Sequence, residues 1–368
     1  MSRCDLCGAH GPVTEHMVDL TKLSIGTRDA PRIRMLTFNM NASSKAYDND
    51  DIRRTVVKPF LEQLEDSTID IFVFCIQEAP KSVQWLVEAL ENNTRFKVAN
   101  SSLVDEVHGD SWASRAFHNR AARDFFLHQI IVYNEEVADV GFEGSRCFGK
   151  LRTCVKGSLI SAIRFGWRGD DAPPDVYVIN SHLPVDTKDK ETFGMAKRVT
   201  AMRTTLEGLG ALYGRKSAVL WTGDLNYRQM DHDDWDGEYE IRPGRNEQLS
   251  MLMRDGSQYN ASFLEDFQEG ERYRARQKGR GVTFNPTCKL VATPDKKNRE
   301  CRRKEDDDSK IVLDCYDQKR SPSWCDRIIY RDSVRHVVLC DDYASFGENA
   351  HMSDHNMVVA SLSIENQF

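Results

Sequence analysis

The chain of 368 residues carries 57 acidic and 50 basic side chains, a formal net charge of −7, and 40% of its residues are hydrophobic. This composition excludes a disordered chain, because the apolar content is sufficient for a large core. The acidic balance argues against a protein that coats nucleic acid, and we expect no nucleic-acid partner. No apolar run reaches the ~20 residues of a membrane-spanning helix, so any membrane contact is expected to be peripheral.

Residues 1–31 are predicted to form a polar extension in front of a single catalytic domain, residues 32–368. The extension holds a group of possible metal ligands, Cys4, Cys7, His10 and His16. Two thiolates and two imidazoles can complete a tetrahedral zinc site. Usual zinc modules place the second ligand pair farther along the chain, so an extension without zinc is the alternative. No basic and apolar leader precedes the cysteines, which favours a cytoplasmic protein with reduced thiols.

Apolar periodicity predicts a mixed α/β domain. The expected strands are residues 33–38, 69–76, 125–133, 159–165, 176–180, 218–221, 327–330, 334–339 and 357–362. The expected helices are residues 52–64, 82–90, 193–212 and 248–253. Pro59 is expected to kink or shorten the first helix.

Polar side chains of catalytic type recur where these strands begin or end. They are Asn39, Asn41, Glu78, Asn180, His182, Asp224, Asn226, Asp326, Asp354 and His355. Taken singly, each has an ordinary explanation as a helix cap or a turn residue. Taken together and in this order, they predict one site at the strand ends.

These residue types suit hydrolysis of a phosphate ester, whose negative charge repels an attacking water. Glu78 and Asn41 offer oxygen ligands that suit Mg²⁺, and the ion would polarise a phosphoryl oxygen. Asp224 and Asn226 lie two residues apart, so in an extended segment both face one side. Asp224 is the candidate general base for a water that Asn226 orients.

Two histidines are the candidate proton donors. His355 is expected to be an imidazolium that donates to the phosphoryl oxygen, with Asp326 as its orienting partner. His182 is a second donor to the same group.

Residues 322–328 read PSWCDRI, which resembles the signature of the inositol polyphosphate 5-phosphatases of the endonuclease/exonuclease/phosphatase superfamily. The polar residues listed above lie in short motifs that match that family in the same order across residues 33–364. The resemblance implies a DNase I-like α/β fold, a four-layer sandwich of two mixed sheets flanked by helices. It also implies that Asn39 is catalytic, that Asp354 is a metal ligand, and that a set of side chains binds substrate: Lys156, Tyr227, Arg228, Lys289, Arg320 and Arg327.

The chain departs from the family at three places. Ala42 stands where the family often has Gly after the first-strand Asn-x-Asn. Residues 286–289 read Pro-Thr-Cys-Lys where the family has Pro-Thr-Tyr-Lys, so Cys288 lacks the phenolic donor to a neighbouring ring phosphate. Lys289 and Arg320 still supply cations for that phosphate. Residues 155–157 read Val-Lys-Gly in place of Asn-Lys-Gly, and Lys156 either reaches the scissile phosphate or lies on an exposed strand end.

We therefore expect a Mg²⁺-dependent phosphomonoesterase that removes the 5-phosphate of phosphoinositides or soluble inositol polyphosphates by direct attack of water. One alternative is a nuclease or another phosphodiesterase of the same superfamily, and the other is an inactive phosphoinositide-binding module. Two segments are either solvated loops or contacts with an anionic lipid surface: residues 272–281, which are strongly basic, and residues 293–310, which change from basic to acidic.

Overall fold

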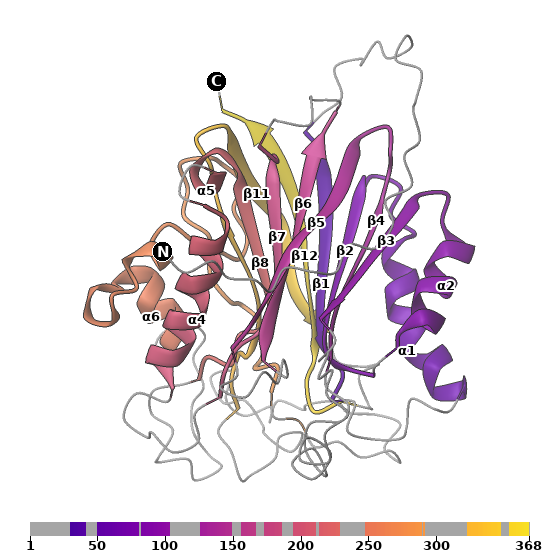
Figure 1. Cartoon of the computed structure of the whole chain (residues 1–368), viewed down its shortest axis with the longest axis horizontal. Helices are drawn as coiled ribbons and strands as arrows, with labels where there is room; N and C mark the ends of the chain where they lie inside the picture. Colours follow the sequence, from indigo (N-terminus) through magenta and orange to yellow (C-terminus); the bar gives the residue numbers. More distant parts are fainter. Residues whose placement is uncertain are drawn as a thin grey trace, which may run out of the picture.

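The computed structural model describes residues 30–41, 50–80, 82–103, 126–148, 156–166, 173–185, 194–210, 213–228, 247–288, 290, 322–346 and 353–367. Two six-stranded mixed sheets pack face to face, with helices on both outer faces (Figure 1). The predicted fold class, a four-layer α/β sandwich, is confirmed. The candidate zinc ligands in the extension and the basic segment 293–310 lie outside the described residues.

The first sheet has the strand order β11-β12-β1-β2-β4-β3. Its strands are β1 (Arg32–Asn39), β2 (Ile71–Ala79), β3 (Lys97–Leu103), β4 (Phe126–Tyr133), β11 (His336–Phe346) and β12 (Met357–Asn366). Two helices cover its outer face, α1 (Asp50–Gln63) and α2 (Gln84–Asn93). Strand β1 is parallel to β2 and antiparallel to β12, which brings the ends of β1 and β2 to the start of β12.

The second sheet has the strand order β5-β6-β7-β8-β10-β9. Its strands are β5 (Ala138–Cys147), β6 (Gly157–Phe165), β7 (Val176–His182), β8 (Ala218–Asp224), β9 (Gln268–Glu269) and β10 (Asp326–Arg331). The helices on this side are α4 (Met195–Gly208), α5 (Tyr213–Lys216), α6 (Gln248–Arg254) and two short 3₁₀ turns, η3 (Ser257–Tyr259) and η4 (Ser262–Leu264). Strand β8 is parallel to β7 and antiparallel to β10, so His182, Asp224 and Asp326 meet at one end.

Three apolar layers hold the sandwich together. Side chains such as Val73, Val178 and Leu220 fill the space between the sheets. Phe60 of α1 packs edge to face on Phe74 of β2, with ring centroids 5.3 Å apart, in the layer under α1 and α2. A third cluster lies between the second sheet and α4 and α6. The central strands are therefore buried on both faces, which explains their continuous apolar sequences.

Three details differ from the expectations. Helix α1 continues past Pro59 to Gln63, so the predicted shortening does not occur. Strands β3 and β5 were not predicted, because edge strands with exposed side chains lack a long apolar run. The described cysteines are free thiols except Cys147, which is disulfide-bonded, so the expectation of reduced thiols is wrong for that residue.

None of the helices in the described part of the chain is both long and apolar enough to cross a bilayer.

Candidate active site

The backbone at the strand ends is shaped to project polar side chains. Asn41, Glu78 and Asn226 have positive φ angles of 45°, 48° and 54°, a left-handed conformation that costs most residues energy. A β-bulge in β2, between Ile76 and Ala79, coincides with the Glu78 turn and redirects its side chain. Strained backbone of this kind concentrates at functional sites, and here it affects three residues that the sequence singled out.

Gly223 is required where β8 passes β7. Its φ angle is 132°, and a Cβ atom there would lie 1.9 Å from the backbone oxygen of Ser181. Only glycine permits this approach. The close contact places Asp224 directly beside His182 in the parallel register.

Asp224 lies at the centre of the site and is almost completely buried. Its Oδ2 accepts a hydrogen bond of 2.9 Å from Asn39 Nδ2 and lies 3.2 Å from His182 Nε2, while its Oδ1 accepts from the Asn226 backbone N–H at 3.1 Å. Burial by itself would raise the pKa of Asp224. The hydrogen bond from His182 and the charges of His182, His355 and Lys156 outweigh burial and hold that pKa well below its ordinary value. Asp224 is therefore an ionised carboxylate at neutral pH.

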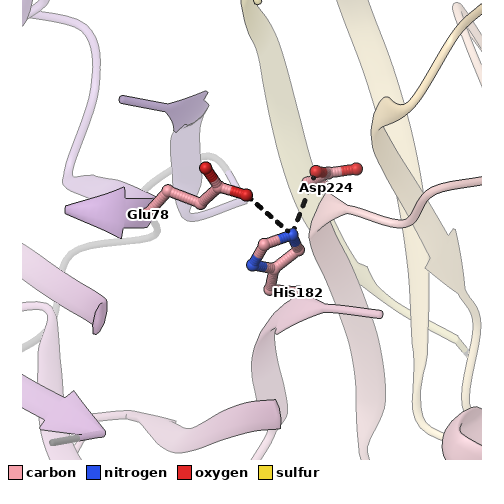
Figure 2. A group of neighbouring side chains, drawn as sticks. All are labelled: Glu78, His182 and Asp224. Carbon is pink, nitrogen blue, oxygen red and sulfur yellow. Dashed lines mark ion pairs between the residues drawn. The ribbon is translucent and has the colours of Figure 1, made fainter. Parts of the chain in front are cut away.

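Glu78, His182 and Asp224 form a compact group of possible metal ligands (Figure 2). One ligand atom from each lies within 4.8 Å of the others, and His182 Nε2 is 3.4 Å from Glu78 Oε1. Two carboxylates from facing sheets suit a hard divalent cation, and His182 adds a nitrogen ligand only when its Nε2 carries no proton and no longer donates to Asp224. The residues present therefore fit a divalent metal.

Lys156 points into the same group. Its Nζ contacts His182 Nε2 and lies 4.0 Å from Glu78 Oε1. Burial lowers the pKa of Lys156, against the opposing effect of the Asp224 and Glu78 charges. The side chains of Lys156 and Glu78 remain 25% and 22% exposed, so solvent reaches the site beside them. The alternative that Lys156 lies on an exposed strand end, away from the chemistry, is wrong.

The other predicted metal ligands have different surroundings. Asn41 N–H donates to Asn39 Oδ1 at 3.0 Å, so this turn fixes the amide that bonds Asp224. Asp354 is not in the ligand group found among the described residues, and its Oδ1 lies 3.8 Å from His355 Nε2. Metal ligation by Asn41 and Asp354 stays a prediction.

His355 and Asp326 form a buried pair. His355 Nδ1 lies 2.7 Å from Asp326 Oδ2, and the Asp326 backbone N–H is held by Thr287 Oγ1 at 3.2 Å. Burial would lower the pKa of His355, but the charge and hydrogen bond of Asp326, with help from Asp224, raise it to about 9. His355 is thus an imidazolium at neutral pH, and the contact with Asp326 that the sequence predicts is present.

Asn226 and Arg228 stabilise the loop after β8. Asn226 Nδ2 donates to the Leu183 backbone oxygen at 2.9 Å, and its Oδ1 accepts from Arg228 Nη2 at 3.3 Å. Arg228 Nη1 also lies 4.0 Å from Cys288 Sγ. Both ends of the Asn226 amide therefore have protein partners that fix the loop, and its contact with the attacking water stays a prediction.

Two residues predicted to bind substrate are structural instead. Tyr227 is fully buried, and its hydroxyl donates to Met202 Sδ at 3.4 Å in the layer under α4. Arg327 is also fully buried, with its guanidinium paired to Glu247 at 2.9 Å and to Glu269. Successive strand residues face opposite sides, so Asp326 faces the site while Arg327 faces away from it. We correct both assignments.

Buried polar side chains support the site from behind, and for two of them, Arg198 and Gln248, the sequence predicted no such role. Gln77 Nε2 donates to Asn180 Oδ1 at 2.7 Å, which joins the two sheets beneath Glu78. Arg198 of α4 donates to Gln248 Oε1 at 2.7 Å, and the same oxygen accepts from the Arg228 backbone N–H at 3.0 Å. Arg198 lies in a helix that the sequence predicts, but the burial of its side chain cannot be predicted from the sequence.

Lys289 and Arg320, the predicted ring-phosphate ligands, lie outside the described residues. The site that is described holds an ionised carboxylate, an imidazolium, a lysine and a potential metal-ligand group at one end of the sandwich. This combination can bind a phosphate ester and direct a water at it.

Comparison with known proteins agrees with this chemistry. A family model described as "Endonuclease/Exonuclease/phosphatase family 2" matches residues 36–361. The Type I inositol polyphosphate 5-phosphatase 5 of Arabidopsis thaliana is 26% identical over 157 residues, which are 40% of this chain and 23% of that protein. The match thus spans less than a quarter of the length of that relative.

Solved structures share the fold at low sequence identity. The human nocturnin catalytic domain with a bound sulfate anion is 11% identical, with 91% of this chain and 96% of that chain covered and a TM-score of 0.50. A Cimex nitrophorin mutant in a ferrous NO complex is 12% identical, with 91% and 98% covered and a TM-score of 0.51. At these identities the likeness shows the fold alone.

Proposed function

Because the chain belongs to the endonuclease/exonuclease/phosphatase family, we propose that it is a Mg²⁺-dependent phosphomonoesterase that removes the 5-phosphate of an inositol phosphate. The observation that carries the proposal is a pair of groups with opposite charge at the strand ends. Asp224 is held ionised by His182 and Asn39, and His355 is held protonated by Asp326. Groups whose pKa values are displaced in opposite directions suit acid and base roles.

Each group has a role that follows from its surroundings. Asp224 accepts a hydrogen bond from the attacking water and orients it, since an ionised carboxylate can only accept. His355 donates to a phosphoryl oxygen, and Lys156 adds a positive charge beside Glu78. A Mg²⁺ ion bound by Glu78, with Asp224 nearby, would neutralise charge on the phosphoryl group and the leaving oxygen.

The inositol phosphate substrate is supported by the distant relative and by residues 322–328. Within that segment, Asp326 faces His355, while Trp324 is fully buried and donates to the Phe284 backbone oxygen at 2.8 Å. The segment therefore anchors the orienting carboxylate as well as resembling the 5-phosphatase signature. The family match covers most of the chain, whereas the 5-phosphatase relative covers 40% of it, so the substrate is the part to test first.

The test is a substrate panel with inorganic phosphate release as the measurement. The panel contains soluble inositol polyphosphates with and without a 5-phosphate, phosphoinositide vesicles, and DNA and RNA duplexes. We expect Mg²⁺-dependent phosphate release from compounds with a 5-phosphate and none from isomers that lack it. Cleavage of a duplex with no phosphate release from any inositol compound would make the protein a nuclease of the same family.

A further inference from the structure

We propose that the end of the sandwich remote from the active site docks on an anionic lipid surface, so that the active site faces the aqueous phase and takes soluble inositol polyphosphates. This surface, called the basic end, comprises Arg215, Lys216, Arg274, Arg276 and Lys278. The statement about the substrate rests on the proposed function, whereas the docking does not.

Residues 272–281 form a loop whose backbone is held in place by the side chain of Arg272. Arg272 is 4% exposed, and its guanidinium makes a bidentate ion pair with Asp332, with N···O distances of 2.8 and 2.9 Å. The same side chain donates to the backbone oxygens of Ala275 and Gln277, which lie inside the loop. A buried arginine that bonds the loop interior holds the backbone in one shape. One of the basic residues of this segment is therefore a structural anchor.

The remaining basic side chains of the loop project outward. Arg274, Arg276 and Lys278 are exposed, and they form no ion pair within the part of the chain that the structure describes. Of the acidic groups near the loop, Glu271 is paired with Arg280 at 3.0 Å, Asp332 with Arg272 and Asp341 with Arg32, while Asp342 is exposed on β11. The loop thus presents three exposed cations close together on a chain whose net charge is −7.

The anchor fixes where this charge lies. Asp332 follows β10, which begins with the active-site residue Asp326 and ends at Arg331. Val334, in the same turn, donates its backbone N–H to the Arg215 oxygen at 3.0 Å. Arg215 and Lys216 close α5, which precedes β8 and lies at the upper end of the sandwich in Figure 1. The basic end and Asp224 are therefore at opposite ends of β8.

The length of β8 gives the distance between the basic end and Asp224. Strand β8 has 7 residues, which at about 3.3 Å per residue puts the basic end roughly 20 Å from Asp224. The headgroup layer of a bilayer is only about 5–8 Å thick on each side. A phosphoinositide in the docked membrane cannot reach across that distance, but a soluble inositol polyphosphate can enter the site freely.

Apolar side chains beside the basic end favour lipid over nucleic acid as the partner. Val334 is 66% exposed and Tyr273 is 45% exposed, and both lie beside the cations. Exposed aliphatic and aromatic side chains among basic residues are typical of surfaces that insert shallowly into the interface of an anionic membrane. A phosphate backbone offers no comparable environment for an exposed valine.

The experiment measures sedimentation of the full chain with phosphatidylcholine vesicles, with and without phosphatidylserine, at low salt. Wild type should bind only the phosphatidylserine vesicles. The triple variant Arg274→Gln, Arg276→Gln, Lys278→Gln should lose on the order of 100-fold in vesicle partitioning, about fivefold for each cation removed. A control, Arg53→Gln, Arg54→Gln, Lys58→Gln, removes the same charge from α1, on the outer face of the first sheet, and should bind as wild type does.

Three results would overturn the proposal. The first is wild type that ignores phosphatidylserine vesicles, and the second is a triple variant that binds them as well as the control. The third is a triple variant that hydrolyses vesicle phosphoinositide more slowly than wild type. That result would mean that docking through the basic end brings the active site to the lipid of the same membrane. Loss of RNA binding in the triple variant, with no vesicle binding by wild type, would identify a nucleic-acid surface. Vesicle binding is measured without turnover, so failure of the proposed activity removes only the third comparison and leaves the docking result intact.

Discussion

The Asp326→Asn substitution tests the acid role of His355 most sharply. The side chain keeps its size, but the negative charge 2.7 Å from His355 Nδ1 is lost. That charge is the main reason why the pKa of His355 rises from the ordinary 6.5 to about 9 although the ring is buried. The difference corresponds to about 3 kcal/mol of interaction with the imidazolium. Without it, the pKa of His355 should return to 6.5 or below.

The expected loss of activity depends on pH. At pH 8 a histidine with a pKa of about 9 is mostly protonated, whereas one with a pKa of 6.5 is protonated in only a few per cent of molecules. With a pKa of 6.5 for His355, phosphate release by Asp326→Asn should be lower by about 30-fold at pH 8 but by less than about twofold at pH 6, and a pKa below 6.5 increases both losses while the loss at pH 8 stays the larger. The measurement is the pH–rate profile at saturating Mg²⁺. An equal loss at both pH values would refute the acid role that we assign to His355.

The contact between His355 and Asp326 also stabilises the folded protein, by an amount that depends on pH. The pKa of His355 is higher in the folded than in the unfolded chain, so its contribution is complete below pH 6.5 and is lost as pH rises through about 9. Asp175→Asn is the matched control, because Asp175 and His336 are also a buried pair, 2.9 Å apart, at the other end of β7. Asp175→Asn should lower the free energy of unfolding without moving the pH–rate profile.

The remaining predictions address other parts of the site. Glu78→Ala should abolish Mg²⁺-dependent turnover and weaken Mn²⁺ binding by at least about tenfold by electron paramagnetic resonance, and unchanged binding would remove Glu78 as a ligand. Gly223→Ala should lower the free energy of unfolding in urea by about 3 kcal/mol or more, because its Cβ would overlap the Ser181 oxygen. Tyr227→Phe should leave KM unchanged and cost about 1 kcal/mol of stability or less, whereas a large rise in KM would restore its substrate role. Cys288→Tyr should destabilise the protein rather than add a phosphate ligand, because Cys288 is only 1% exposed, and a gain of substrate affinity without loss of stability would contradict this.

Much of the fold could be predicted from local sequence because burial leaves a direct pattern. Strand β2 reads as an unbroken apolar run since both of its faces are covered, by the other sheet and by α1 and α2. Strands β3 and β5 lie at sheet edges with many exposed side chains, so their sequences carry no such pattern. They pair with β4 and β6, the next strands along the chain, but these backbone hydrogen bonds leave no apolar pattern in the sequences of β3 and β5.

For the site, local sequence predicts which side chains stand at the ends of the buried strands, and hence the kind of chemistry available. Which of these side chains meet depends on how the strands pair in the folded protein. The register of β8 with β7 and β10 places Asp224 beside His182 and Asp326, and the alternation of β10 turns Asp326 inward and Arg327 into a buried ion pair. The physical reason is that residue type is local, whereas distance, burial and pKa depend on strands that pair across much of the chain.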